Sequence, residues 1–325
     1  MSGDNSYRDE LRKIRSLLIV TSLQKRKDIK ALQSIESFSK ELDWEPLEDL
    51  MIDRVVWKYV VHTMDYEPKY VFSHPSIIMF DKQTSLYYRC LCGLSLKSAK
   101  EYVGNVESME EGKPKAKVSK DKALRLSQIY NTFMCSIIQN SIDWTLENGK
   151  RTIIATLGIT LDGVMRNRIG EIAEERIRTL LLDWLIENNL IVDPTITKEM
   201  LLEGNTPRVF RLVEDLVMRF GSEPDVAFYK DAKLLATLEI KGGIDPAGAL
   251  ERYGAATKSF QHAIASNPHC KNFYVGGIFT EELERRITSD RLVEKVFSVI
   301  DLLDVAEYRT VFFKELFHHV LRLSY

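Results

Sequence analysis

A short motif of two acids and a lysine in the second half of the sequence has the residue types needed for metal-assisted hydrolysis. Pro224-Asp225 is followed fourteen positions later by Glu239-Ile240-Lys241. Because side chains alternate along a strand, Glu239 and Lys241 would share one face while Ile240 points into the core. If residues 231–233 form an odd-numbered hairpin loop, Asp225 lies opposite Glu239. The motif thus predicts that two carboxylates and an ammonium group converge at one end of a hairpin.

Such a cluster would suit a hard divalent cation. Two facing carboxylates are unfavourable unless a cation lies between them. Mg²⁺ prefers oxygen ligands, polarises phosphoryl oxygens and lowers the pKa of a bound water. Lys241 would orient that water and stabilise charge on the phosphate. The predicted chemistry is Mg²⁺-dependent phosphodiester hydrolysis; the alternative is a surface Glu–Lys pair and an aspartate that opens a turn.

A helix expected from Arg168 to Asn188 supplies a fourth candidate acid. On this helix Glu174 lies at the border of the apolar stripe, whereas Glu171 and Glu175 point nearly opposite it. A border acid can reach a water beside the sheet, so Glu174 is the predicted member of the site. The alternative is an acid that only favours the N-terminal part of the helix.

Two further regions are candidates for DNA contact. After Gly242-Gly243, Asp245 and Pro246 read as the N-cap and first residue of a helix over 246–265. This helix presents Arg252, Ser259 and His262 on one face, either as a solvated face or as contacts to DNA. Residues 104–122 form either a solvated surface loop or a basic arm that follows phosphates. The lysines of that arm are Lys113, Lys115, Lys117, Lys120 and Lys122.

The elements that position these residues indicate an α/β fold. From residue 151 onward we expect the helix over 168–188, a strand at 190–192, a helical stretch over 209–219, strands at 225–229 and 234–240, the helix over 246–265 and a strand at 273–279. This order predicts a mixed β-sheet flanked by helices, the catalytic domain, over 151–325. Residues 1–150 read as a mostly helical region for DNA binding or dimerisation, with a helix from 123 to about 146. Within it, 70–80 and 85–91 are expected to be extended around a turn.

Composition limits the remaining possibilities. The 325 residues carry 45 Lys and Arg against 47 Asp and Glu, a net charge of -2, which by itself argues against a nucleic-acid partner. Four cysteines with no CxxC spacing argue against zinc and a disulfide scaffold. No stretch reaches membrane-spanning length and no signal peptide is visible, so we expect a reduced, cytoplasmic protein with no membrane partner. The apolar stripe over 312–321 is expected to be core or a dimer face.

Asp225, Glu239 and Lys241 resemble the PD-(D/E)XK nuclease signature. Residues 85–91, 168–174 and 238–254 are most similar to type II restriction endonucleases of the XcyI group. The resemblance implies a restriction-endonuclease-like core in which Asp225, Glu239 and the Ile240 backbone carbonyl bind Mg²⁺, Lys241 assists hydrolysis and Glu174 is an accessory acid. It also implies a homodimer that cuts both strands of double-stranded DNA at a palindromic, GC-rich site such as CCCGGG. A DNA methyltransferase is expected in the same system, without a stable complex.

Two other functions remain open from the sequence. The same core would serve a repair or recombination nuclease that recognises DNA structure instead of sequence. A non-catalytic DNA-binding protein would carry the acid-x-lysine motif only as a surface ion pair.

Overall fold

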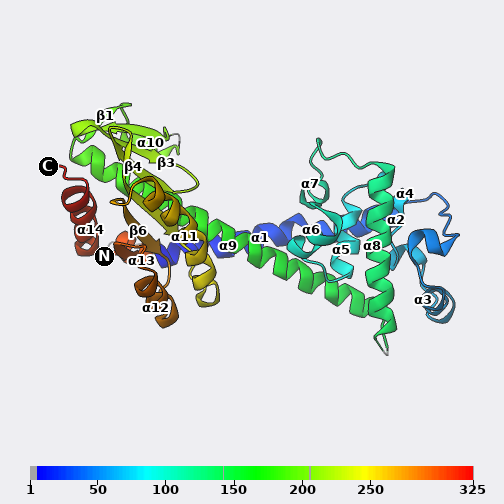
Figure 1. Cartoon of the computed structure of the whole chain (residues 1–325). Coiled ribbons are helices and arrows are strands. Elements are labelled where there is room, and N and C mark those ends of the chain that lie inside the picture. The colour runs from blue at the N-terminus through cyan, green and yellow to red at the C-terminus, as the bar shows by residue number, and fades with distance from the viewer. Residues whose placement is uncertain (1–5, 142, 205, 325) are drawn as a thin grey trace. The chain divides into compact units, whose positions relative to one another are not determined.

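The computed structural model describes residues 6–141, 143–204 and 206–324 and divides the chain into two compact units. The sheet unit comprises the chain up to Ser16 and from Met165 onward; the helical unit is Leu17–Val164. Both divisions lie within helices, α1 (Tyr7–Lys25) and α9 (Leu146–Glu187) (Figure 1). The boundary expected at about residue 150 therefore falls inside α9 and not between elements.

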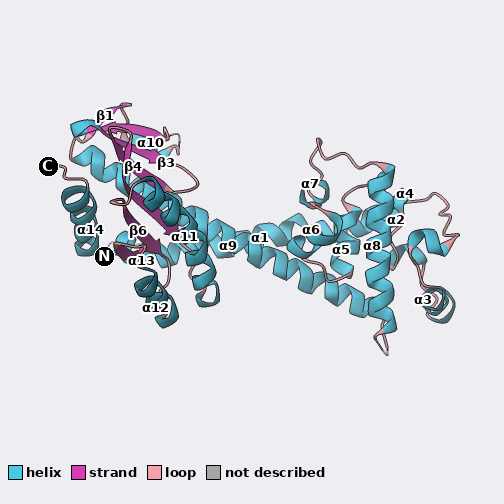
Figure 2. Cartoon of the chain, in the orientation of Figure 1, coloured by secondary structure: helices cyan, strands magenta, loops and turns pink. Residues whose placement is uncertain are grey.

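The sheet unit contains a seven-stranded mixed sheet with the strands in chain order (Figure 2). Strands β1 to β5 pair antiparallel, and β5, β6 and β7 pair parallel. The strands are β1 (Ile191–Asp193), β2 (Val209–Leu212), β3 (Leu216–Phe220), β4 (Val226–Lys230), β5 (Lys233–Lys241), β6 (Lys271–Gly276) and β7 (Lys295–Ser298). This confirms the predicted α/β class with a mixed sheet.

Helices cover both faces of this sheet. The core on one face combines the α9 stripe, which includes Ile177 and Leu181, with Phe273 of β6 and the C-terminal helices. Tyr274, which points to the other face, packs with α11 (Ala249–Ser266) and α12 (Glu281–Asp290). The C-terminal helices are α13 (Val299–Asp304), α14 (Ala306–Phe313) and a last helical segment (Lys314–Val320). The aromatic stripe of these helices belongs to the buried core, which is one of the two alternatives predicted for residues 312–321.

The prediction of a helix over 209–219 is wrong. This segment forms β2 and β3, joined by a short helical turn at Val213–Asp215. Buried and exposed residues alternate along β2, with Phe210 and Leu212 inside. The apolar residues of so short a segment fit both a helix period and a strand period, and pairing with β4 selects the strand.

The helical unit is built around a second apolar core. Its helices are α2 (Lys27–Ser37), α3 (Arg54–Trp57), α4 (Pro75–Phe80), α5 (Thr84–Leu91), α6 (Leu96–Val103), α7 (Glu107–Glu110), α8 (Lys120–Gln139) and the first part of α9, with short helical turns at Leu47–Leu50, Lys58–Thr63 and Pro68–Tyr70. α8 ends before the predicted limit of 146. Gly149 lies in α9, where a Cβ would be 2.6 Å from Leu91 Cδ1.

The expectation of extended segments over 70–80 and 85–91 is also wrong, because these residues form α4 and α5. Pro75 is the first residue of α4, where its missing N–H costs no hydrogen bond. The His74 side chain caps this helix by accepting from Ser76 N. Every residue of α5 is buried. A segment buried on all sides has no polar face, and its tyrosine-rich composition then imitates a strand.

Candidate active site

The hairpin of β4 and β5 places the acids and the lysine of the motif together, by a different route from the one predicted. Its turn has two residues, Asp231 and Ala232, both with positive φ. A two-residue turn alone would put Asp225 opposite Leu238. The register shifts by one residue at a bulge opposite Phe228 and Tyr229, after which Val226 pairs with Leu238. Continued by one residue, this register sets Asp225 opposite Glu239.

Lys241 forms ion pairs with both carboxylates. Its Nζ lies 3.1 Å from Asp225 Oδ2 and 2.7 Å from Glu239 Oε2. Asp225 Oδ2 also accepts a hydrogen bond of 2.6 Å from the backbone N–H of Ile240. Asp225 and Glu239 are only 5% and 1% exposed. The predicted convergence of two carboxylates and an ammonium group is therefore present, in a buried setting.

Burial and charge oppose each other in setting the protonation of this cluster. Burial raises the pKa of Glu239, and Asp225 adds to this, while Lys241 acts in the opposite direction without cancelling it. Burial by itself would lower the pKa of Lys241, but Asp225 and Glu239 outweigh burial and raise it. Lys241 therefore remains an ammonium ion at neutral pH, held by the two acids.

Glu174 is the glutamate of α9 that faces this cluster. Burial, followed by the nearby Asp225, raises the pKa of Glu174, and Lys241 lowers it in part. Glu171 and Glu175 are exposed and instead pair with Arg168, at 2.9 and 3.3 Å. The placement of Glu174 at the border of the apolar stripe is confirmed.

A glycine lets α9 approach the end of β5. A Cβ at Gly242 would collide with the Cβ of Ala173, the residue before Glu174. The absence of a side chain at Gly242 thus allows the helix to carry Glu174 toward Asp225. Gly242 alone has this packing role, because a Cβ at Gly243 would instead meet the guanidinium of Arg252.

The three residues predicted on one face of the 246–265 helix have different surroundings. His262 is exposed on α11. Arg252 is half-buried, and its guanidinium donates to the backbone carbonyl of Asp245. Asp245 caps the turn that leads into α11 by accepting from Ala247 N, as expected for an N-cap.

Ser259 does not lie on a solvent face, so its prediction as a DNA contact conflicts with the structure. It is 5% exposed, and its hydroxyl lies near enough to Glu239 to lower the pKa of that carboxyl. Ser259 belongs to the buried stripe of α11, with Tyr253, Ala256 and Phe260. The helical spacing of this stripe is visible in the sequence. It was the signal that could have placed Ser259 on the buried side of the helix, facing the site.

The oxygen donors of the cluster fit a hard cation. Glu239 Oε1 is fully buried and has no hydrogen-bond partner among the described residues. Since the N–H and C=O of one strand residue point to the same side, the Ile240 carbonyl lies on the side of Asp225, to which its N–H donates. Two carboxylates and a carbonyl leave positions for water, as Mg²⁺ requires. No group of three or more His, Cys, Asp or Glu suited to a metal occurs in the described part of the chain.

The predicted DNA-contact lysines belong to the other unit. Lys113, Lys115 and Lys117 are exposed in the segment between α7 and α8 of the helical unit. They are not part of the carboxylate–lysine cluster, which lies wholly in the sheet unit.

A mixed sheet between helices, with Asp225, Glu239 and Lys241 converging at the end of one hairpin, is the arrangement of a restriction-endonuclease-like hydrolase. The family model of the XcyI restriction endonuclease matches residues 31–316. The chain therefore belongs to this family and is a type II site-specific deoxyribonuclease, with DNA as its substrate. No curated protein sequence matches the chain. No helix among the described residues is both long and apolar enough to cross a membrane.

Proposed function

We propose that the chain cuts double-stranded DNA by Mg²⁺-dependent hydrolysis at a PD-(D/E)XK site formed by Asp225, Glu239 and Lys241. The observation that carries the proposal is the buried cluster itself, in which Glu239 Oε1 has no partner among the described residues. Asp225, Glu239 and the Ile240 carbonyl would hold the ion. When bound, Mg²⁺ supplies charge stabilisation at the scissile phosphate and an acidified water.

The residues of the chain divide the remaining work. The Ile240 N–H fixes the orientation of the Asp225 carboxylate. Because the pKa of Lys241 is raised, its ammonium donates hydrogen bonds and does not accept a proton from the attacking water. It orients the water and stabilises negative charge on the phosphate. Glu174, whose pKa is raised by burial, is the better candidate to accept a proton from water.

The organisation of cleavage is part of the same proposal. A duplex has two strands, and we infer that a homodimer with two-fold symmetry cuts both at a palindromic site. The resemblance noted in the sequence favours a GC-rich target and a companion DNA methyltransferase that forms no stable complex with this chain.

The direct test is digestion of long DNA with Mg²⁺, followed by sequencing of the ends, with Ca²⁺ as the non-catalytic control. We expect discrete fragments with the wild-type chain. Asp225→Asn preserves the shape of the side chain and an acceptor for Ile240 N–H, and should lower cleavage at least about 100-fold because it removes a charged ligand. Asp231→Asn, at the exposed turn of the same hairpin, is the matched control and should cut normally.

Three results would contradict the proposal. Undiminished cleavage by Asp225→Asn would remove the site assignment. Cutting confined to branched or damaged DNA would indicate a structure-specific nuclease. Binding of DNA without cutting under any divalent cation would indicate a non-catalytic protein.

A further inference from the structure

We propose that the helical unit carries a binding site for the DNA phosphate backbone, built from two lysine clusters that are distant in the sequence. A cavity of about 420 Å³ is lined by Lys25, Lys27 and Lys30 from the start of the chain and by Lys113 from the segment after α7. We call this cavity with its four lysines the lysine pocket. The inference rests on the proposed function, because it concerns the substrate of the site in the sheet unit.

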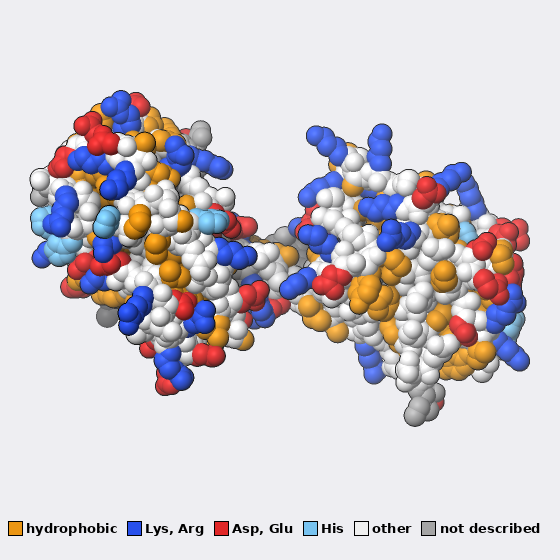
Figure 3. Space-filling model, viewed as in Figure 1, with side chains coloured by type: hydrophobic (Ala, Val, Ile, Leu, Met, Phe, Trp, Pro, Cys, Tyr) orange, Lys and Arg blue, Asp and Glu red, His pale blue; other side chains and the backbone are white. Residues whose placement is uncertain are grey.

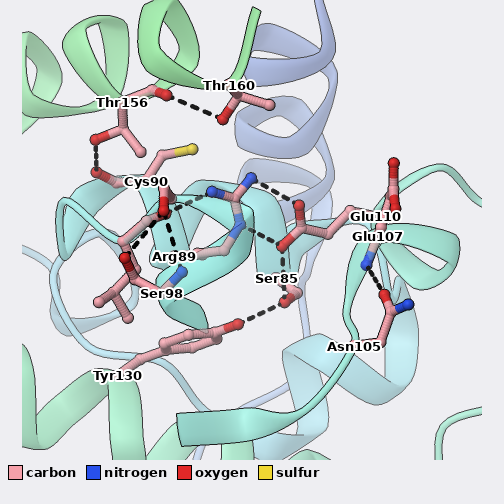
Figure 4. A network of polar contacts seen from close by, with 12 residues as sticks. Ser85, Arg89, Cys90, Ser98, Asn105, Glu107, Glu110, Tyr130, Thr156 and Thr160 are labelled. Carbon is pink, nitrogen blue, oxygen red and sulfur yellow. Dashed lines mark hydrogen bonds and ion pairs between the residues drawn. The ribbon is translucent and has the colours of Figure 1, made fainter. Parts of the chain in front are cut away.

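A buried ion pair fixes one wall of the lysine pocket. Arg89 of α5 donates to both carboxylate oxygens of Glu110 in α7, each at 2.8 Å (Figure 4). The Ser85 hydroxyl lies between Glu110 and the Tyr130 hydroxyl. Glu110 lines the pocket, but its charge is balanced by Arg89. This carboxylate therefore gives the pocket a rigid wall without neutralising the lysines.

The segment that carries Lys113 is held in place, unlike a free arm. Lys82 Nζ donates to the backbone carbonyls of Lys113 and Ala116, at 2.7 and 3.0 Å. Gln83 Nε2 donates to the carbonyl of Glu110 at 3.3 Å. These bonds come from the residues that immediately precede α5. The basic segment predicted over 104–122 thus has a defined position beside the first lysine cluster.

The lysines converge on one exposed carboxylate. Glu111 Oε2 lies 2.8 Å from Lys113 Nζ, and Glu111 Oε1 lies 4.0 Å from Lys27 Nζ. The hydrogen bond from Lys113 and the charges of Lys27 and Lys25 lower the pKa of Glu111. Within the described residues, Lys25 and Lys30 form no ion pair. Asp81 also lines the pocket, where its carboxylate accepts from the Ser34 hydroxyl and Gln83 N–H. Four lysines therefore face two carboxylates that Arg89 does not balance, Glu111 and Asp81, and the cations are in excess.

The open form of this site favours a DNA backbone over a small anion. Lys25, Lys30 and Lys113 are exposed on long, flexible side chains at the rim. Lysines of this kind contact phosphates as point charges and carry no base specificity. Lys and Arg side chains are spread over the visible face of the helical unit with Asp and Glu side chains among them (Figure 3), and the whole chain has a net charge of -2. The four lysines of the pocket supply a local attraction that the total charge of the chain lacks.

The test measures binding of a fluorescent random-sequence duplex to the full chain in Ca²⁺, over about 50 to 200 mM salt. The variant Lys25→Ala/Lys30→Ala/Lys113→Ala should bind more weakly. The magnitude of its slope of log affinity against log salt should fall by about 0.9 for each phosphate that is no longer neutralised. Over this fourfold salt range, the loss of affinity should therefore be roughly 3.5-fold smaller per phosphate than in the wild type. Lys58→Ala/Lys97→Ala removes exposed lysines of the same unit outside the pocket and should leave the slope unchanged.

The outcomes separate this inference from the proposed function. An unchanged salt slope in the triple variant, with a normal circular dichroism spectrum, would overturn the lysine pocket as a DNA site. Retention of wild-type binding by Lys25→Arg/Lys30→Arg/Lys113→Arg would support the lysine pocket as a DNA site, because arginine keeps the charge. We expect inorganic phosphate to compete with DNA no better than chloride does at equal ionic strength. Strong and selective competition by phosphate would indicate a site for a small anion instead. Wild-type binding without cleavage in Mg²⁺ would remove the proposed function and leave the salt result standing.

Discussion

Lys241 explains how two carboxylates remain buried at one end of a hairpin. Without a cation, Asp225 and Glu239 would repel each other at low solvent exposure. The ammonium of Lys241, 2.7 Å from Glu239 and 3.1 Å from Asp225, offsets this repulsion in the chain alone. The motif is therefore also a structural device, which keeps the residues of the proposed metal site assembled in the chain alone.

Glu174 provides the sharpest prediction at the scale of single residues. Glu174→Gln keeps the size of the side chain but removes a carboxylate that interacts with Asp225 and Lys241. We expect cleavage to slow by about 10- to 100-fold, the usual effect of losing a polar partner around a metal site. The measurement is the single-turnover rate of plasmid cleavage in Mg²⁺.

The control for this change is Glu171→Gln, one helical turn away and exposed beside Arg168. It should cleave at the wild-type rate. Equal reductions in the two variants would show that α9 acts only through its stability, and a reduction confined to Glu171→Gln would assign the accessory acid to the opposite face.

At the scale of elements, the residues of the site were more predictable than the turn and strand register that bring them together. Strand alternation is local, so the shared face of Glu239 and Lys241 follows from the sequence. The opposition of Asp225 and Glu239 depends on loop length, and a predicted three-residue loop gave the right pairing for the wrong reason. The structure uses a two-residue turn and a bulge. A bulge is set by packing across the sheet and leaves no local signal here.

Elements that are buried on all sides or are only a few residues long were the least predictable. The helix α5 and the strands β2 and β3 lack a clear polar face or are too short for periodicity to separate the two classes. Their form is decided by neighbours: β3 pairs with β4, β2 pairs with β1 and β3, and α5 packs against α2. Ser259 was misplaced for a related reason, since a polar residue in an apolar stripe was assigned to the solvent side.

The cap of α4 predicts a pH dependence for the helical unit. His74 Nδ1 accepts from Ser76 N, and Nε2 lies 3.0 Å from the Asp43 carbonyl, which requires a neutral ring. Burial lowers the pKa of His74 below its usual 6.5. The unfolded chain therefore takes up a proton first as pH falls through 6.5, and the stability present above that pH is lost toward the lower, folded-state pKa.

His74→Asn should retain the cap, worth about 1 kcal/mol, without this titration. We expect its melting temperature to fall less than that of the wild type between pH 7 and 5. Tryptophan fluorescence reports on this unit, since Trp44, Trp57 and Trp144 lie in it and Trp184 does not. Exposed His62→Asn is the control and should follow the wild type; a parallel fall in all three proteins would exclude His74 as the cause.

At the scale of the whole molecule, charge and chemistry are divided between two units. The sheet unit contains the buried acids and Lys241, and the helical unit contains the lysine pocket. A net charge of -2 is the sum over both units and conceals a local excess of either sign. Net charge therefore predicts that attraction to arbitrary DNA is modest and salt-sensitive, and it does not exclude a nucleic-acid substrate.

The number of sites gives a prediction about assembly. Among the described residues, one buried cluster joins two carboxylates to a lysine. Under the proposed function, one chain therefore supplies one site for one strand. If the chain acts as a homodimer, mixing wild type with excess Asp225→Asn yields dimers with a single competent site. Such dimers should convert supercoiled plasmid to nicked circles, resolved on a gel, whereas wild type alone gives linear DNA. Slower production of linear DNA without accumulation of nicked circles would instead indicate that each active chain cuts both strands in turn.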